Sequence, residues 1–390
     1  MKILITTIFD YPHEGGLSTH VSTLKNGLEA SGHVVDVLSF TKLNPLFRKV
    51  YAQAPGYLIN KVKPGKGQLI NDRNRMSLLS SQIKEVKEKY DVINSQDIYA
   101  ALASIESGLP TVATVHGYFS YEAISRGAMV ENSPEDYEVR ELERKAYQQA
   151  NRVIAVDKRI REYIKNVANV DAITIKNFIN VASFQPSLVN GEKVKQELGI
   201  PSNTKMLFVP RRLTEKNGVI FPTLALPKVL EKHPQTMLVY AGTGEQMESI
   251  LAKKEELGIG NQVKMLGSVP HEKMRELYAA ADVVLVPSIH SKGVEEATSI
   301  SALEAMGSGA PVVAGAVGGL KEIFTHEVDG LLVEEQNVND LAHAITRILD
   351  DSSYGKQLAN RAREKVVNEY SHIAAAKSFE QIYLEAISTH

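Results

Sequence analysis

The sequence predicts an α/β protein with two doubly wound domains, each built on a parallel sheet. The chain has 390 residues, more than a single hydrophobic core usually serves, so we expect at least two domains. Short β-branched runs alternate with longer segments of helical period, which is the pattern of parallel sheets with right-handed crossovers. This alternation occurs in two series with a polar segment between them.

The first series supplies the strands of the amino-terminal domain. Segments of helical period separate these strands, and the first helix is expected over residues 19–31, where Gly32 is suited to end it. The expected strands cover residues 2–6, 34–40, 91–94, 111–115, 152–156 and 172–175.

The second series supplies the carboxyl-terminal domain, with strands expected at residues 206–209, 237–241, 263–266, 283–286, 311–314 and 330–333. The segment between the two series is polar and contains Pro186, Gly191 and Pro201, which is typical of a linker. We expect ligands in a cleft between the two domains, outside the carboxyl ends of the strands. The expected domain bounds are 1–180 and 203–370, with the linker over 181–202.

Composition and charge exclude several classes of protein and partner. Lys and Arg number 44 against 46 Asp and Glu, a net charge of −2, so no nucleic-acid partner is expected. The absence of cysteine excludes a disulfide scaffold, a thiolate zinc site and thiol catalysis, and it fits a reducing compartment. No stretch approaches the roughly 18 apolar residues that span a bilayer, and the first residues lack a signal-peptide pattern. We therefore expect a cytoplasmic protein that is not integral to a membrane.

Residues 41–89 differ from the rest of the chain in charge. They hold eleven Lys or Arg against three acidic residues, with Phe47, Tyr51 and Tyr57 interleaved. Basic residues with aromatic neighbours suit anionic lipid headgroups, so a peripheral contact with the inner face of the cell membrane is one interpretation. A solvated surface segment is the other, and the sequence leaves both open.

Two glutamates separated by seven residues, Glu296 and Glu304, flank the start of an expected helix. If this helix begins near Thr298 or Ser299, Glu304 lies about two turns inside it and Glu296 lies in the loop before it. The helix amino terminus offers unpaired N–H groups to a diphosphate, and carboxylates can accept hydrogen bonds from sugar hydroxyls. A capped amphipathic helix with solvent-facing glutamates is the alternative.

This pair resembles the Glu-x7-Glu motif of retaining glycosyltransferases with the GT-B fold, in particular glycosyltransferase family 4. The resemblance implies that Glu296 contacts the donor sugar and that Glu304 binds the ribose hydroxyls of the nucleotide. Ser299 and Ile300, at the expected helix start, belong to the same implied nucleotide-sugar site. The Gly-Phe-Gly that usually follows the first glutamate is Ala297-Thr298-Ser299 here, a departure that alters the sugar pocket.

A basic loop follows the first strand of the second series. It resembles the family's Gly-Arg-Leu…Lys-Gly loop, which implies that Arg212 and Lys216 bind the donor diphosphate. Two fixed cations can neutralise the charge that grows on a departing nucleoside diphosphate. Arg211 replaces the family's glycine, so which arginine points inward stays open, and a surface loop without a ligand is the alternative.

Two strand-end segments of the amino-terminal domain also match the family. Residues 13–20 resemble its Gly-Gly…His segment, which implies that Gly16 lies near the phosphates and that His20 contacts the acceptor. His116 ends a strand, and the resemblance implies that it contacts the donor hexose. A tight turn and two structural histidines are the alternatives. No Gly-x-Gly-x-x-Gly fingerprint is present, which argues against a dinucleotide cofactor.

Weaker matches follow in the order found in the family. Gly242 and the backbone near Leu266 follow two successive strands and resemble the family's nucleotide-side loops. Asn180 replaces the aspartate of the segment between the domains. Residues 371–390 resemble the terminal helix that crosses back to the first domain. The resemblance therefore extends over nearly the whole chain.

The resemblance implies a retaining hexosyltransferase that uses a UDP-sugar, with glucose slightly ahead of N-acetylglucosamine and a GDP-sugar still open. The implied acceptor is a glycan or a lipid-linked intermediate of exopolysaccharide or envelope polysaccharide synthesis. No Asp-x-Asp sequence occurs, so neither a divalent metal nor another cofactor is expected. Two alternatives stay open: a sugar-nucleotide epimerase of similar shape, and a non-enzymatic two-domain sugar-binding protein.

Overall fold

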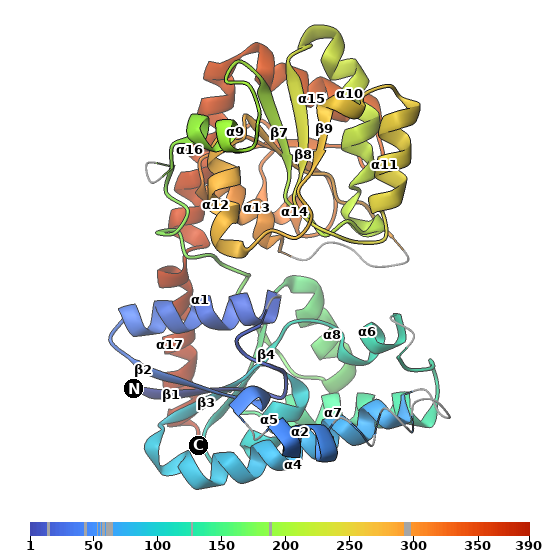
Figure 1. Ribbon diagram of the computed structural model, residues 1–390. Coiled ribbons are helices and arrows are strands. Elements are labelled where there is room, and N and C mark those ends of the chain that lie inside the picture. The colour runs from blue at the N-terminus through green and yellow to red at the C-terminus, as the bar shows by residue number, and fades with distance from the viewer. Residues whose placement is uncertain are drawn as a thin grey trace. The chain divides into compact units, whose positions relative to one another are not determined.

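The structure, a computed structural model, describes residues 1–13, 16–42, 45–52, 54, 56, 59, 65–125, 128–186, 189–291 and 298–390. The chain divides into two compact units (Figure 1): unit 1 comprises Met1–Asn177 with His372–His390, and unit 2 comprises Phe178–Ser371. Each unit contains a six-stranded sheet in which neighbouring strands pair in parallel. The prediction of two doubly wound α/β domains is confirmed.

The sheet of unit 1 has the strand order β2-β1-β3-β4-β5-β6. All residues of the central strands β3 and β4 are buried, because helices cover both faces of a parallel sheet. The strands are β1 (Lys2–Thr7), β2 (Val34–Ser39), β3 (Val92–Ser95), β4 (Thr111–Val115), β5 (Arg152–Ala155) and β6 (Ile173–Thr174).

The helices of unit 1 begin at side chains suited to cap them. Asp97, Ser133 and Asp157 each accept a hydrogen bond from a backbone N–H in the first turn of α5, α7 and α8. Helices α4, α5 and α7 lie on one side of the sheet and α1 lies on the other (Figure 1). The described helices are α1 (Gly16–Ala30), α2 (Pro45–Ala52), α4 (Lys66–Val86), α5 (Ile98–Ile105), α6 (Phe119–Ser125), α7 (Pro134–Gln149), α8 (Lys158–Ala168) and α17 (His372–Ser388).

The terminal helix α17 belongs to unit 1 and packs against α1. The two helices approach closely at Gly27, where a Cβ atom would collide with the carbonyl oxygen of His372. Tyr383 of α17 is fully buried, and its hydroxyl accepts a hydrogen bond of 2.6 Å from the Asn94 side chain of β3. The last residues of the chain are therefore part of the core of unit 1.

The sheet of unit 2 has the strand order β12-β11-β10-β7-β8-β9. Its strands are β7 (Lys205–Val209), β8 (Thr236–Tyr240), β9 (Val263–Met265), β10 (Val283–Val286), β11 (Val312–Gly315) and β12 (Leu331–Val333). Its described α-helices are α9 (Gly191–Glu197), α10 (Ile220–Lys232), α11 (Met247–Glu256), α12 (His271–Ala280), α13 (Ile300–Gly307), α14 (Leu320–Ile323), α15 (Val338–Asp350) and α16 (Ser352–Glu369). None of the helices in the described ranges is long and apolar enough to cross a membrane.

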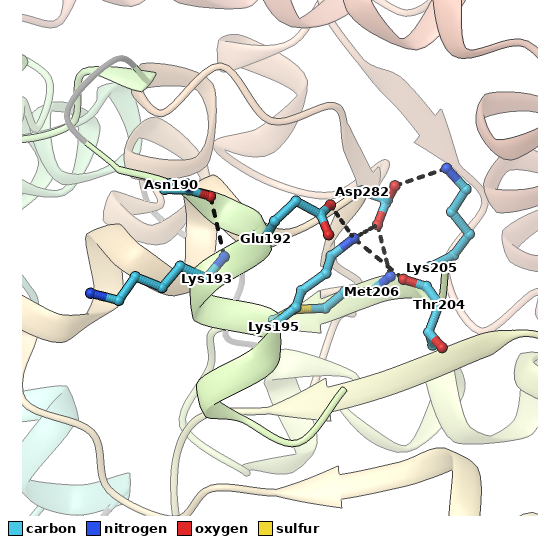
Figure 2. A network of polar contacts seen from close by, with 8 residues as sticks. All are labelled: Asn190, Glu192, Lys193, Lys195, Thr204, Lys205, Met206 and Asp282. Atoms are coloured by element: carbon cyan, nitrogen blue, oxygen red, sulfur yellow. Dashed lines mark hydrogen bonds and ion pairs between the residues drawn. The ribbon is translucent and has the colours of Figure 1, made fainter. Parts of the chain in front are cut away.

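Residues 181–202, where we expected a linker, lie within unit 2. Helix α9 of this segment is attached to the sheet by Asp282, as Figure 2 shows. The Asp282 carboxylate accepts hydrogen bonds from Lys195 Nζ (2.8 Å), Lys205 Nζ (3.0 Å) and the Met206 backbone N–H (2.9 Å). These contacts lower the pKa of Asp282 even though its burial alone would raise it. Lys195, one of the polar residues of this segment, therefore pairs with a residue 87 positions further along the chain.

Candidate functional site

Four loops at the carboxyl edge of the unit 2 sheet pack closely on one another. Gly218, Gly242 and Gly315 make this possible, because a Cβ atom at each would collide with a backbone carbonyl oxygen of a neighbouring loop. For Gly242 that oxygen belongs to Arg211, so the loop after β8 lies directly against the loop after β7. Gly242 also has a φ of +150°, which side chains rarely adopt.

Arg211 is the arginine of the basic loop that points inward. It is buried, and its guanidinium donates hydrogen bonds to the hydroxyls of Ser299 (2.7 Å), Ser301 (2.9 Å) and Ser288 (3.2 Å). Ser299 is the residue before α13 and Ser288 follows β10. Arg211 therefore joins the loop after β7 to the start of α13.

Arg212 and Lys216 are exposed on the same loop. The Arg212 carbonyl accepts hydrogen bonds from the Asn217 side chain (2.7 Å) and the Thr214 backbone N–H (2.8 Å), which fix the loop's backbone. Within the described part of the chain, neither the Arg212 guanidinium nor the Lys216 ammonium is paired with a carboxylate. Both cations are therefore free to meet an anion from solution.

Glu304 lies inside α13, where its carboxylate is buried and held by two side chains of α12. Its Oε1 is 2.7 Å from His271 Nε2, and its Oε2 accepts a hydrogen bond of 2.9 Å from the Tyr278 hydroxyl. The bond to Glu304 raises the pKa of His271. The helix itself begins at Ile300, one or two residues after the expected start at Thr298 or Ser299, and Glu296 lies outside the described residues.

No sequence motif pointed to His271 and Tyr278. They lie seven residues apart on α12, two helical turns, so they share the face that meets α13. That spacing was visible in the sequence, but nothing local connects it with Glu304, which lies 26 residues beyond Tyr278. The Leu266 backbone N–H donates to the Tyr240 carbonyl (2.8 Å), so this group is not available to a base.

In unit 1, His116 and His20 lie against each other. His116 follows β4, and its Nε2 is 2.9 Å from Gln96 Oε1. The His20 ring on α1 meets the His116 ring edge-on, with 4.6 Å between ring centroids. Burial lowers the pKa of His20 to about 4 and the pKa of His116 well below its usual value, so both rings are neutral at pH 7. His20 is only 3% exposed, so it supports His116 rather than presenting its own ring at the surface.

A cavity of about 540 Å³ opens at the carboxyl edge of the unit 1 sheet. It is mainly apolar, with polar groups contributed by His116, Gln96, Asp97 and Glu122. Leu17, the residue after Gly16 at the start of α1, also lines it. Its size suits a small organic group, since ligand pockets are typically a few hundred Å³ and apolar with a few polar groups.

Comparison with known proteins agrees with these observations. The sequence model described as Glycosyltransferase Family 4 matches residues 14–183, and the one described as Glycosyl transferases group 1 matches residues 190–365. A glycosyltransferase of Methanocaldococcus jannaschii is 30% identical over 403 residues, covering 98% of both chains. Two solved structures share the fold at 21% identity and full coverage of both chains: sucrose-phosphate synthase of Thermosynechococcus elongatus, with a TM-score of 0.74, and Anabaena HepE with UDP-glucose, with a TM-score of 0.68.

Membership in one family accounts for the motif residues that follow strands in both units. The match extends over both units, and the relative that is 30% identical aligns with almost all of the chain. Because the two sheets and their order of elements are also those of GT-B glycosyltransferases, we conclude that this chain belongs to glycosyltransferase family 4, the group 1 glycosyltransferases.

Proposed function

We propose that this chain is a retaining hexosyltransferase that takes glucose or N-acetylglucosamine from a UDP-sugar. The observation that carries the proposal is a pair of exposed cations, Arg212 and Lys216, which no carboxylate of the described ranges pairs, on a loop that Arg211 joins to the start of α13. A diphosphate needs fixed positive charge and backbone N–H donors, and this loop and helix start offer both. The fold relative HepE has been solved with UDP-glucose, which favours UDP and glucose.

The proposed reaction proceeds with retention at the anomeric carbon. The bond from this carbon to the diphosphate oxygen breaks, and the acceptor hydroxyl oxygen bonds to the same face. The acceptor proton passes to the departing phosphate oxygen. Arg212 and Lys216 stabilise the charge that develops on the leaving diphosphate, so the proposal needs no divalent metal. The backbone of Gly16 and the side chains of His116 and Glu296 are assigned to the donor sugar and phosphates.

Replacing Arg212 tests the assignment. Arg212→Ala should lower the rate of UDP release from UDP-glucose by about 100-fold or more, as loss of a charge-stabilising donor does in other enzymes. Arg361→Ala is the control, because Arg361 is an exposed arginine of α16 and not part of this loop. Excess EDTA should leave the rate unchanged, and NMR of the product should show the donor's anomeric configuration. Full activity of Arg212→Ala would contradict the role proposed here.

The acceptor is proposed to be a glycan or a lipid-linked intermediate, with an acceptor group in the unit 1 cavity. The cavity's apolar lining with a few polar groups supports an acceptor that is not purely hydrophilic. Product analysis distinguishes this activity from that of a sugar-nucleotide epimerase: transfer consumes an acceptor and releases UDP, whereas an epimerase releases an altered sugar nucleotide without any acceptor.

Peripheral contact with anionic lipid remains part of the proposal. On α2, Leu46, Val50 and Tyr51 are 73%, 64% and 42% exposed beside the exposed Lys49, a combination that suits a lipid headgroup layer. Much of the basic segment 41–89 pairs internally or lies outside the described residues, so α2 carries the argument. Flotation with phosphatidylglycerol vesicles should show binding at low salt that Val50→Glu weakens. No binding at low salt would favour the solvated-segment interpretation.

A further inference from the structure

Among the described residues, both side chains that hold the Glu304 carboxylate come from α12. His271 and Tyr278 each donate to a different carboxylate oxygen, and Figure 1 shows α12 beside α13. A carboxylate oxygen can accept two hydrogen bonds, so each oxygen keeps one acceptor position for a ligand. Two fixed donors on one side therefore leave two parallel acceptor positions, which suit a vicinal pair of hydroxyls.

The two donors themselves are held by aromatic packing. The Phe184 ring meets the rings of His271 and Tyr278 edge-on, with centroid distances of 6.0 and 6.1 Å. Phe208 of β7 meets Tyr278 in the same way at 5.4 Å. These contacts restrict both rings, and the rings in turn hold the Glu304 carboxylate in place. Glu304 therefore loses little side-chain conformational freedom when a ligand binds.

The two donors differ in exposure. Tyr278 is fully buried, whereas the His271 side chain is 55% exposed beside the Glu304 side chain, which is 6% exposed. His271 therefore lies at the surface end of this contact and Tyr278 at its buried end. Its removal leaves no cavity in the core, and Tyr278 still holds the second oxygen.

We propose that His271 is a positioning residue of the nucleotide site, which holds the Glu304 carboxylate so that it accepts hydrogen bonds from the two ribose hydroxyls. The inference rests on the proposed function, together with the ribose-binding role that the family resemblance implies for Glu304. The inference also predicts a contribution to specificity: His271 favours binding of a ribonucleotide over a deoxyribonucleotide. A residue with a merely structural role would affect both nucleotides equally.

The test is calorimetric titration of the full chain with UDP and with 2′-deoxy-UDP. We expect His271→Ala to weaken UDP binding about tenfold, the effect of a charge-assisted hydrogen bond, and to change 2′-deoxy-UDP binding much less. His271→Gln, whose amide can donate to the same oxygen, should restore most of the preference. His233→Ala is the matched control, because it removes a similar histidine–carboxylate contact, with Asp350 at 2.9 Å, elsewhere in unit 2.

Glu304→Gln separates failure of this inference from failure of the proposed function. If it reduces the preference for UDP while His271→Ala leaves the preference intact, the inference is overturned and the ribose role of Glu304 stands. If Glu304→Gln leaves the preference intact, the ribose role itself fails, and the inference fails with it. Equal weakening of both nucleotides by His271→Ala would assign His271 a structural role and overturn the inference.

Discussion

Acid should destabilise unit 1 through His20, which is buried in its neutral form. His20 packs against His116 and is 3% exposed, so protonation in the folded state would place a positive charge in the core next to a second imidazole. The unfolded chain accepts the proton freely. His20→Gln removes this titration while keeping a side chain that can bond to Asn177, the polar partner of His20.

The size of the effect follows from the pKa of His20, which burial lowers from 6.5 to about 4. A depressed histidine pKa contributes stability that is present above pH 6.5 and is lost as the pH falls toward 4. Integrated between about pH 7 and about pH 5, this shift corresponds to a loss of about 2 kcal/mol in the free energy of unfolding. The loss is specific to the wild type, because glutamine does not titrate.

The assay is urea unfolding at a series of pH values, followed by far-ultraviolet circular dichroism. The measure is the difference between the wild type and His20→Gln, because other buried groups also titrate in this range. We expect the wild type to lose about 2 kcal/mol more than the variant on going to about pH 5. His343→Gln, at an exposed position on α15, should behave as the wild type does. Equal losses for the wild type and His20→Gln would refute the reasoning.

Three further predictions concern Glu143, Gly242 and Asp282. Burial raises the pKa of Glu143 from 4.5 to about 7, so its contribution to stability is lost as pH rises through this range; Glu143→Gln should remove about 3 kcal/mol of that dependence in the same urea assay. Gly242→Ala should displace the Arg211 carbonyl and weaken UDP binding measured by calorimetry, whereas Gly258→Ala, also at positive φ but with no neighbour within 4 Å, should not. Asp282→Ala should lower the free energy of unfolding of unit 2 by about 3 kcal/mol in chemical denaturation, because it removes the 2.8 Å partner of the buried Lys195 ammonium and leaves it only the Glu192 carboxylate, at 4.0 Å.

The strands were predictable because each is a short apolar run between polar breaks. The bounds of all twelve predicted strands lie within one residue of those observed, and residues 283–286 and 111–115 agree at both ends. Strands that are buried on both faces are apolar at every position and do not alternate with polar residues. A continuous run of valines and leucines therefore predicts such a strand. The segment 181–202 was harder to interpret, because prolines and glycines near polar residues are equally typical of a linker and of a capped helix such as α9.

The side-chain contacts of the site residues were harder to predict from the sequence than the strands were. Side chains of neighbouring residues in an extended segment point in opposite directions, so one of Arg211 and Arg212 was bound to face inward, but spacing alone does not say which. The choice depends on Ser299 and Ser301, which lie 88 and 90 residues further along the chain. Likewise, the burial of His20 depends on the opposing ring of His116.

Two departures from the family's motifs meet in the structure. Arg211 stands where the family has glycine, and its guanidinium donates to the Ser299 hydroxyl, which stands where the family has the last glycine of Gly-Phe-Gly. A guanidinium has donors only, so Ser299 must accept from it and keeps its own proton to donate elsewhere. The pair also brings a buried positive charge to the start of α13, where it adds to the positive end of the helix dipole. A motif search that required both glycines would reject this chain, yet the two substitutions together preserve a helix start suited to a negatively charged ligand.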